Sequence, residues 1–137
     1  MLYPKMSSGR MVFDLNGIWD FKLLEHAGEK RDEAGLHLTG LRPMPVPSSY
    51  NDIYPGKKFA DHVGEMVYQR TIHVTEQMKR ERLVLRFGSV AHTAEVYLNG
   101  ELLGKHKGGF LPFSFEISEK AIIGDNLLTV FVNNIVD

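Results

Sequence analysis

Cysteine is absent from all 137 residues of this chain. Small secreted domains often depend on disulfides, so a chain without cysteine fits a reducing compartment. Long hydrophobic runs are missing too. The first ten residues, MLYPKMSSGR, lack the apolar core of a signal peptide, and no stretch approaches the roughly 18 apolar residues of a membrane span. These absences predict a cytoplasmic protein that is not embedded in a membrane.

A strong charge of either sign is also lacking. Lysine and arginine number 16 and aspartate and glutamate 17, which leaves a formal net charge of -1. Such a chain has no electrostatic footprint for nucleic acid or for an anionic membrane, so neither is expected as a partner. Internal repeats and low-complexity linkers are not found, while the 43% hydrophobic content is ordinary for a globular protein. We expect one domain over residues 1–137, with residues 1–10 as an arm on its surface.

What is present is a series of short alternating segments. Residues 83–87 and 93–98 alternate apolar residues with others, which is the period of a half-buried strand. Asn99-Gly100 follows, and because both residues tolerate positive φ, this dipeptide is the strongest short hairpin signal. Residues 101–106 are the predicted return strand. Alternation resumes after a glycine loop, so residues 82–117 are expected to form antiparallel β-structure.

Further strands are predicted outside this region, and proline marks one segment as peripheral. Pro43, Pro45 and Pro47 cannot donate ladder hydrogen bonds, so their segment is an edge strand or a loop. The charged residues 25–40 are expected to be a loop with one helical turn, and residues 78–81 a polar turn. The other predicted strands are 11–15, 19–24, 66–74 and 127–133, of which the last is apolar on both faces. About eight or nine short strands predict an all-β fold, a two-sheet antiparallel sandwich.

Ten positions between residues 99 and 116 carry a resemblance to a known family. They are Asn99, Gly100, Gly104, His106, Gly108, Gly109, Phe110, Pro112, Phe113 and Glu116. In this order they resemble the N-terminal sandwich domain of family 2 glycoside hydrolases, the group of β-galactosidases and β-glucuronidases. Residues 45–52, with the opening Met-Leu-Tyr-Pro, are more similar to the β-glucuronidases of this family. Tyr68 and Arg70 match the family's Trp-Tyr-x-Arg, with Val67 in place of the tryptophan.

The resemblance implies a jelly-roll of the galactose-binding-domain type that carries no catalytic residue. In this family both catalytic glutamates lie in a later (β/α)8 barrel domain, an immunoglobulin-like domain is also part of the chain, and the whole enzyme hydrolyses β-D-glucuronides with retention. The chain therefore looks like the N-terminal fragment of such an enzyme. Its implied partners are the remaining domains of its own chain, further copies in a homo-oligomer, and a glucuronide in the parent enzyme.

Two residues are candidates for substrate-proximal or interdomain contacts. Asn51 and Asp52 match the family's Asn-Asp and lie in the long polar loop 48–64, which in family members points toward the catalytic barrel. An Asx-capped turn, in which these side chains bond nearby amides, is an equally good interpretation. The matched motif positions are expected to have structural roles: Tyr68, Arg70, Asn99, Gly100, His106, Gly108, Gly109, Pro112 and Phe113.

No pattern predicts a catalytic group, a cofactor or a metal. A retaining glycosidase needs two carboxyl groups about 5–5.5 Å apart, whereas the acidic residues of this chain are scattered and unpaired. The six histidines lack ligand spacing, and the serines lack an adjacent base. Gly108-Gly109 is followed by no helix that would supply amide donors to a phosphate. Alternation places most aromatic residues, Trp19 included, in the core and not on a sugar-stacking platform.

Two other functions stay open. An autonomous carbohydrate-binding module would present tryptophan or tyrosine rings to solvent. The same sandwich also occurs in sister enzymes such as β-galactosidases and β-mannosidases, and only the run at residues 45–52 favours a glucuronidase.

Overall fold

A computed structural model describes residues 5–8, 11–25, 28–46, 65–88, 93–107 and 113–133. Asn51, Asp52, Gly108, Gly109 and Pro112 lie outside the described residues. The strands are β1 (Lys5–Ser8), β2 (Met11–Asp14), β3 (Gly17–Leu23), β4 (Arg42–Val46), β5 (Glu65–Val74), β6 (Leu83–Phe87), β7 (Thr93–Leu98), β8 (Glu101–Lys107), β9 (Phe113–Glu116) and β10 (Gly124–Asn133). A 3-10 turn, η1 (Arg31–Glu33), and a short helix, α3 (Glu76–Lys79), complete the described elements.

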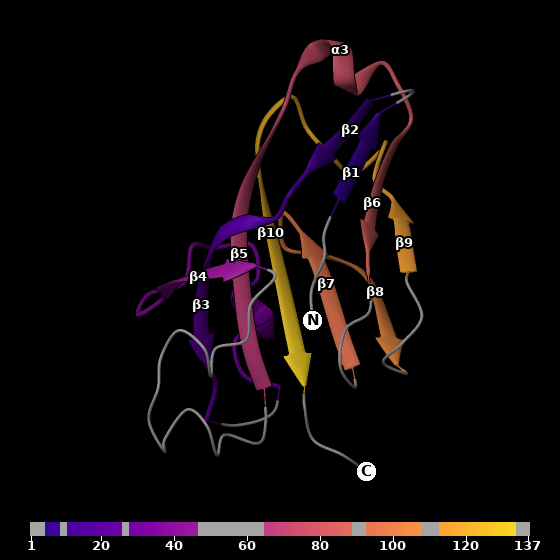
Figure 1. Ribbon diagram of the computed structural model, residues 1–137. Coiled ribbons are helices and arrows are strands. Elements are labelled where there is room, and N and C mark those ends of the chain that lie inside the picture. Colours follow the sequence, from indigo (N-terminus) through magenta and orange to yellow (C-terminus); the bar gives the residue numbers. More distant parts are fainter. Residues whose placement is uncertain are drawn as a thin grey trace.

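The strands form two facing sheets (Figure 1). The small sheet has the order β2-β1-β6-β9, and the large sheet has the order β4-β3-β5-β10-β7-β8. All of the pairings among the described strands are antiparallel. The predicted all-β sandwich of two antiparallel sheets is confirmed, and among the described strands the proline-bearing β4 stands at an edge, as its sequence indicates.

The large sheet carries a hydrophobic core on each of its faces. On the inner face, Trp19 and Phe21 are 1% exposed and pack with residues of the small sheet such as Leu85. On the outer face, Val67 and Phe131 form a second cluster with Leu24, Ala34, Leu38, Leu41 and Tyr97. The described residues among 24–25 and 28–41 thus cover the outer face, which explains why the central strand β10 is apolar on both of its sides.

Two local predictions are corrected. Residues 5–8 belong to β1, between β2 and β6, and Met6 is 2% exposed, so this part of the chain is not a surface arm. A single apolar residue in Lys5-Met6-Ser7-Ser8 is too weak a period-2 signal to be recognised. The predicted polar turn at residues 78–81 overlaps α3, whose Thr75 hydroxyl accepts a 3.2 Å hydrogen bond from the Met78 amide. A threonine N-cap of this kind starts a helix.

Two possible features are not found among the described residues. No described helix has both the length and the apolar character that crossing a membrane requires. Within the same ranges, no group of three histidine, aspartate or glutamate side chains could hold a metal ion.

Candidate functional site: a charged pocket at one end of the large sheet

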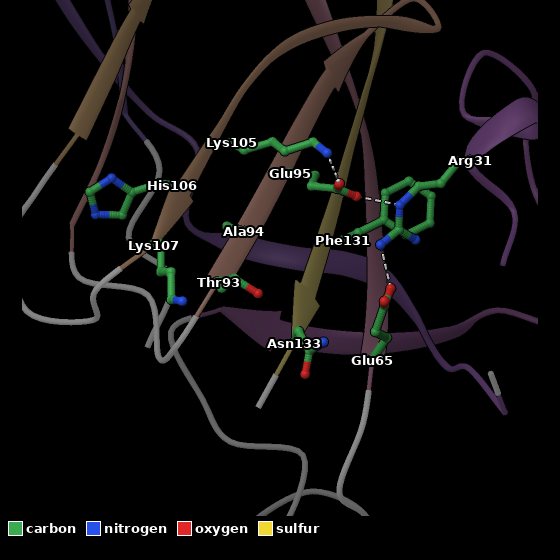
Figure 2. Close-up of a pocket in the computed structure, with 10 residues that line it drawn as sticks. All are labelled: Arg31, Glu65, Thr93, Ala94, Glu95, Lys105, His106, Lys107, Phe131 and Asn133. Atoms are coloured by element: carbon green, nitrogen blue, oxygen red, sulfur yellow. Dashed lines mark hydrogen bonds and ion pairs between the residues drawn. The ribbon is translucent and has the colours of Figure 1, made fainter. Parts of the chain in front are cut away.

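A pocket of about 340 Å³ lies at one end of the large sheet (Figure 2). Antiparallel pairing brings four strand ends together at this place. The first residues of β5 and β7 lie beside the last residues of β10 and β8. The η1 turn adds one side chain from the outer face. The lining residues are Arg31, Glu65, Thr93, Ala94, Glu95, Lys105, His106, Lys107, Phe131 and Asn133.

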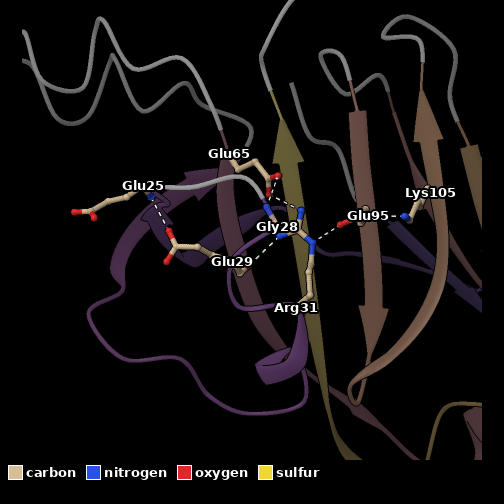
Figure 3. A network of polar contacts seen from close by, with 7 residues as sticks. All are labelled: Glu25, Gly28, Glu29, Arg31, Glu65, Glu95 and Lys105. Atoms are coloured by element: carbon tan, nitrogen blue, oxygen red, sulfur yellow. Dashed lines mark hydrogen bonds and ion pairs between the residues drawn. The ribbon is translucent and has the colours of Figure 1, made fainter.

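Arg31 is the centre of the pocket's charged groups (Figure 3). Its Nη2 donates to Glu65 Oε2, and its Nε donates to Glu95 Oε2. The guanidinium carbon lies 3.8 Å from the centroid of the Phe131 ring, which is a cation–π contact. A further hydrogen bond of 3.0 Å joins Arg31 Nη1 to the carbonyl of Glu29. One planar cation therefore fixes two strands and its own turn together.

The charges form a chain of alternating sign. Lys105 Nζ lies 3.2 Å from Glu95 Oε1, so the order is Glu65, Arg31, Glu95, Lys105. The exposed fraction of the side chain is 5% for Glu65, 23% for Arg31 and 20% for Glu95, but 69% for Lys105. The Arg31 contacts are therefore the shielded part of the network and the Lys105 contact is the solvated part.

Glu65 is also held by the backbone of the covering segment. Gly28 N donates to Glu65 Oε1 at 2.9 Å, and Leu24 N donates to the Glu65 carbonyl at 2.9 Å. With Arg31, three residues of segment 24–31 bind the first residue of β5. The entry of the chain into β5 is thereby tied to the outer cover of the sheet.

This arrangement does not have the form of a glycosidase pair. A retaining glycosidase needs a free space for the sugar between its acid and its nucleophile. Here Glu65 and Glu95 bind the same guanidinium, which occupies the space between the two carboxylates. The four residues Arg31, Glu65, Glu95 and Lys105 neutralise one another, and Lys107 adds a further cation to the pocket lining.

Sequence reasoning missed the roles of Arg31 and Glu65. Glu95 lies opposite Phe131 in the pairing of β7 with β10. The signal in the sequence is the apolar strand β10 next to an acidic residue, Glu95, on the neighbouring strand β7. Such a pair indicates that a cation covers this face of the sheet. The charged segment 25–40 contains several cations, however, and nothing in its pattern distinguishes Arg31.

The motif residues Asn99 and Gly100 form the predicted hairpin turn. Their φ angles are 51° and 85°, as a two-residue turn with both central residues at positive φ requires. The Asn99 side chain also accepts a 2.9 Å hydrogen bond from Leu127 N and donates one of 2.9 Å to Asn126 Oδ1. This turn is therefore fastened to the start of β10.

Tyr68 and Arg70 act at the crossing between the two sheets. Arg70 Nη1 donates to the carbonyls of Leu15 and Asn16, where the chain passes from β2 in one sheet to β3 in the other. The Tyr68 ring packs on Phe21, with 5.2 Å between the ring centroids. Both residues stabilise the fold at a distance from the pocket.

His106 and Phe113 stack on each other between β8 and β9. Their ring centroids are 4.2 Å apart with planes inclined by 15°. His106 lines the pocket wall, but Figure 2 shows its ring directed away from Glu95 and Arg31. Of the motif positions within the described ranges, His106 alone lines the pocket. The described motif residues are therefore distributed through the fold and do not converge on one site.

The fold and this pocket define a β-sandwich domain with a recess lined by paired charges at one end of the large sheet. The chain belongs to the family described as glycosyl hydrolases family 2, sugar binding domain, whose model matches residues 12–137. This result confirms the family resemblance carried by residues 99–116.

Individual relatives lead to the same family. A β-glucuronidase of Paenibacillus borealis is 41% identical over 100% of this chain, and one of Homo sapiens is 34% identical over 98%. Among solved structures, a β-glucuronidase of an uncultured Clostridium sp. is 44% identical over 98% of this chain with a TM-score of 0.84. A Bifidobacterium dentium β-glucuronidase, complexed with coumarin-3-O-glucuronide, has a TM-score of 0.85 at 38% identity over the full chain.

The lengths of these proteins differ greatly from that of this chain. It spans 23% of the Paenibacillus and human proteins. It spans 23% of the Clostridium chain and 21% of the Bifidobacterium chain.

Proposed function

We propose that this chain is the non-catalytic N-terminal domain of a retaining β-glucuronidase, and that it packs on the catalytic domain and contributes to the rim of its substrate pocket. Support comes from relatives named β-glucuronidase that match 98–100% of this chain with less than a quarter of their own length. In this proposal the catalytic carboxyl groups lie in a later barrel domain, and an immunoglobulin-like domain is also part of the longer chain.

The observation that carries the non-catalytic role is the pairing of Glu65 and Glu95 with Arg31. A single guanidinium holds both of these carboxylates. A guanidinium beside a carboxyl group favours its ionised form, which disfavours the general acid that a glycosidase needs, and here it also fills the space that the sugar would occupy. The pair is therefore assigned to structure.

The alternative of an autonomous carbohydrate-binding module finds less support. Trp19 is 1% exposed, and in the pocket the Phe131 ring, also 1% exposed, has Arg31 over its face. Neither ring can stack on a sugar. The sister specificities are disfavoured by the names of the relatives, which are β-glucuronidases from bacteria and mammals.

The proposed partners are the later domains of the same protein, a glucuronide substrate and further copies in a homo-oligomer. A cytoplasmic location is part of the same proposal. No cofactor or metal is part of the proposal.

The test is hydrolysis of a chromogenic aryl β-D-glucuronide by the 137-residue chain and by a longer protein that continues through the native reading frame. We expect no turnover by the short chain and turnover by the longer protein. Turnover by the short chain would overturn the non-catalytic role. A longer protein that is folded but hydrolyses a galactoside or mannoside instead would overturn the glucuronidase assignment.

A further inference from the structure

A row of four polar side chains crosses the end of the large sheet. Asn133 of β10 is paired with Glu65 of β5 on one side and with Thr93 of β7 on the other. Thr93 is in turn paired with Lys107 of β8. Directly paired residues of antiparallel strands have their side chains on the same face. Asn133 comes two residues after Phe131, which belongs to the outer cluster, so the row lies on the outer face. All four residues of the row line the pocket (Figure 2).

Lys107 gives the pocket a positive charge that the carboxylates of the lining do not neutralise. Three cations and two carboxylates line the pocket, so its formal net charge is +1 with the histidine neutral: Arg31, Lys105, Lys107, Glu65 and Glu95. Arg31 and Lys105 are bound to the carboxylates. The Lys107 ammonium has no ion pair or hydrogen bond within the part of the chain that the structure describes. Such a cation in a pocket attracts an anion.

The amount of charge favours a carboxylate over a phosphate group. One carboxylate would bring the net charge of the lining to zero. A phosphate monoester carries a charge of about −1.5 to −2 at pH 7, and the excess would be repelled by Glu65 and Glu95. Thr93 lies on the strand next to Lys107, and its hydroxyl likewise has no partner among the described residues. An ammonium and a hydroxyl on neighbouring strands can each donate to one oxygen of the same carboxylate.

The rest of the pocket offers polar partners for hydroxyl groups. Each carboxylate oxygen of Glu95 holds one cation and keeps a second lone pair that can accept from a hydroxyl. The amide side chain of Asn133 stands in the row beside Thr93. The cavity of about 340 Å³ is in the range of small-molecule sites and exceeds the size of a carboxylate group alone. We propose that the pocket binds a small hydroxycarboxylate. Its carboxylate binds Lys107 and Thr93. Its hydroxyl groups donate to Glu95 and bind the amide of Asn133.

Recognition at this site is ionic and does not use an aromatic ring. The face of Phe131 is covered by the guanidinium of Arg31 at 3.8 Å. His106 stacks on Phe113, and Figure 2 shows its ring directed away from Glu95 and Arg31. A neutral polyol therefore has neither a stacking surface nor a charge partner in this pocket. The site thus differs from that of a carbohydrate-binding module, and it does not depend on the proposed function.

The experiment follows the backbone amide signals of the isotopically labelled 137-residue chain by NMR during titration with D-gluconate at pH 7. Ionic strength is held constant with potassium chloride, because salt screens an exposed charge. We expect saturable shifts of the amides of Thr93, Lys107 and Asn133, with a Kd of about 1–10 mM, as a solvated site with few contacts implies. The amides of β1, in the small sheet, serve as the reference for effects outside the pocket.

Three other six-carbon ligands separate the parts of the proposal. Sorbitol has the hydroxyl groups of gluconate without its charge, and hexanoate has the charge without the hydroxyl groups. We expect each of them to bind at least about tenfold more weakly than gluconate, because each loses one of the two kinds of contact. Sorbitol 6-phosphate keeps the hydroxyl groups but carries more charge than the lining can neutralise, so it should also bind more weakly than gluconate.

Four variants test the residues that hold the carboxylate. Lys107→Gln should raise the Kd for gluconate about tenfold, whereas Lys107→Arg keeps the charge and should stay within about threefold of the wild type. Thr93→Val removes the hydroxyl with little change of shape and should raise the Kd about threefold. Lys5→Gln is the matched control, because Lys5 is an exposed lysine of β1, outside the pocket lining. It should leave the Kd unchanged.

Several outcomes would overturn the proposal. One is the absence of saturable shifts in the pocket up to about 50 mM gluconate. Another is an unchanged Kd in Lys107→Gln, or an equal loss of affinity in Lys5→Gln, since binding would then not depend on the pocket cation. Equal binding of hexanoate or of sorbitol would contradict the assignment to a hydroxycarboxylate, and tighter binding of sorbitol 6-phosphate would contradict the single negative charge. The proposed function is tested separately, by glucuronide hydrolysis in the longer protein.

Discussion

The backbone of Gly35 lies directly against the backbone of Gly100. A Cβ atom built on Gly35 would be 3.1 Å from the Cα of Gly100, and one built on Gly100 would be 3.0 Å from the Cα of Gly35. The segment that covers the outer face of the large sheet thus touches the β7–β8 hairpin turn with no side chain between them. This close approach requires glycine in both places.

Alanine substitutions at this contact should destabilise the fold by different amounts. Gly35→Ala brings its Cβ against backbone that cannot rotate away, and should cost about 1–3 kcal/mol, as other overpacked sites do. Gly100→Ala should cost more, because Gly100 also has a φ of 85° that alanine adopts only with strain. Urea denaturation of the three proteins gives the free energies of unfolding.

Gly28 is the matched control for the conformational part of this effect. Its φ is 82°, close to that of Gly100, but nothing lies within 4 Å of a Cβ built on it. Gly28→Ala therefore measures the strain of positive φ alone. If Gly100→Ala destabilises no more than Gly28→Ala, the contact with Gly35 does not restrict the hairpin.

Gly104 is required for packing against an aromatic ring. A Cβ on Gly104 would lie 2.5 Å from Cε1 of Phe115 and 3.2 Å from its Cζ, so the ring would have to move. Phe115 packs edge-on against Phe113 at 5.7 Å, which limits this movement. We expect Gly104→Ala to cost about 1–3 kcal/mol of unfolding free energy.

The cause can be tested in a background with a smaller residue. In Phe115→Leu, the added methyl group of Gly104→Ala meets no aromatic ring, so the second substitution should cost less than it does in the wild type. A double-mutant cycle by chemical denaturation measures the difference. Equal costs in the two backgrounds would assign the effect of Gly104→Ala to the backbone and not to Phe115.

The sandwich was predictable because its signals are local. Asn99-Gly100 sets a turn through its own φ angles, and the alternation of Ala94, Val96 and Leu98 sets which face of β7 is buried. The prolines of β4 exclude it from the sheet interior. Each of these features depends only on residues that are neighbours in the sequence, so it can be recognised before the fold is known.

The pocket was not predictable for the opposite reason. Arg31 meets Glu65 and Glu95, which are 34 and 64 residues away in the sequence. Its neighbours in the chain give no period that singles it out. A cation in a charged stretch is usually solvated, and only the register of β7 and β10 places Phe131 and Glu95 together beneath it. Long-range polar pairs of this kind leave no local pattern.

Gln69 and Thr129 form a buried polar link between the large sheet and its cover. Gln69 Nε2 donates to Thr129 Oγ1 and to the Leu36 carbonyl, each at 2.9 Å, and Gln69 Oε1 accepts from Leu38 N at 3.0 Å. We expect Gln69→Leu to cost about 1–3 kcal/mol, because the backbone groups of the covering segment lose their partner in a buried place. Denaturation midpoints measure this loss.

The same network offers an isosteric test with an internal control. Thr129→Val should lower the unfolding free energy by about 1–3 kcal/mol, since Thr129 is 0% exposed and its hydroxyl binds the Ala34 carbonyl. Thr71→Val makes the same change at an exposed position of β5, and should stay within about 0.5 kcal/mol of the wild type. Equal effects would mean that the hydroxyl of Thr129 does not stabilise the cover.

Strand β2 should cause the 137-residue chain to self-associate. It is an edge strand of the small sheet among the described strands, and its Met11 and Val12 are 54% and 67% exposed. An apolar strand edge is a template for pairing with another chain. We expect the sedimentation coefficient of the chain to rise with concentration.

Val12→Lys should suppress this rise, because a lysine on an edge strand opposes pairing. Ile122→Lys replaces another exposed aliphatic side chain (55%), outside the strands, and should leave the association unchanged. A wild-type chain that sediments as a monomer at every concentration would contradict the prediction, and suppression by Ile122→Lys alone would assign the association to a different surface.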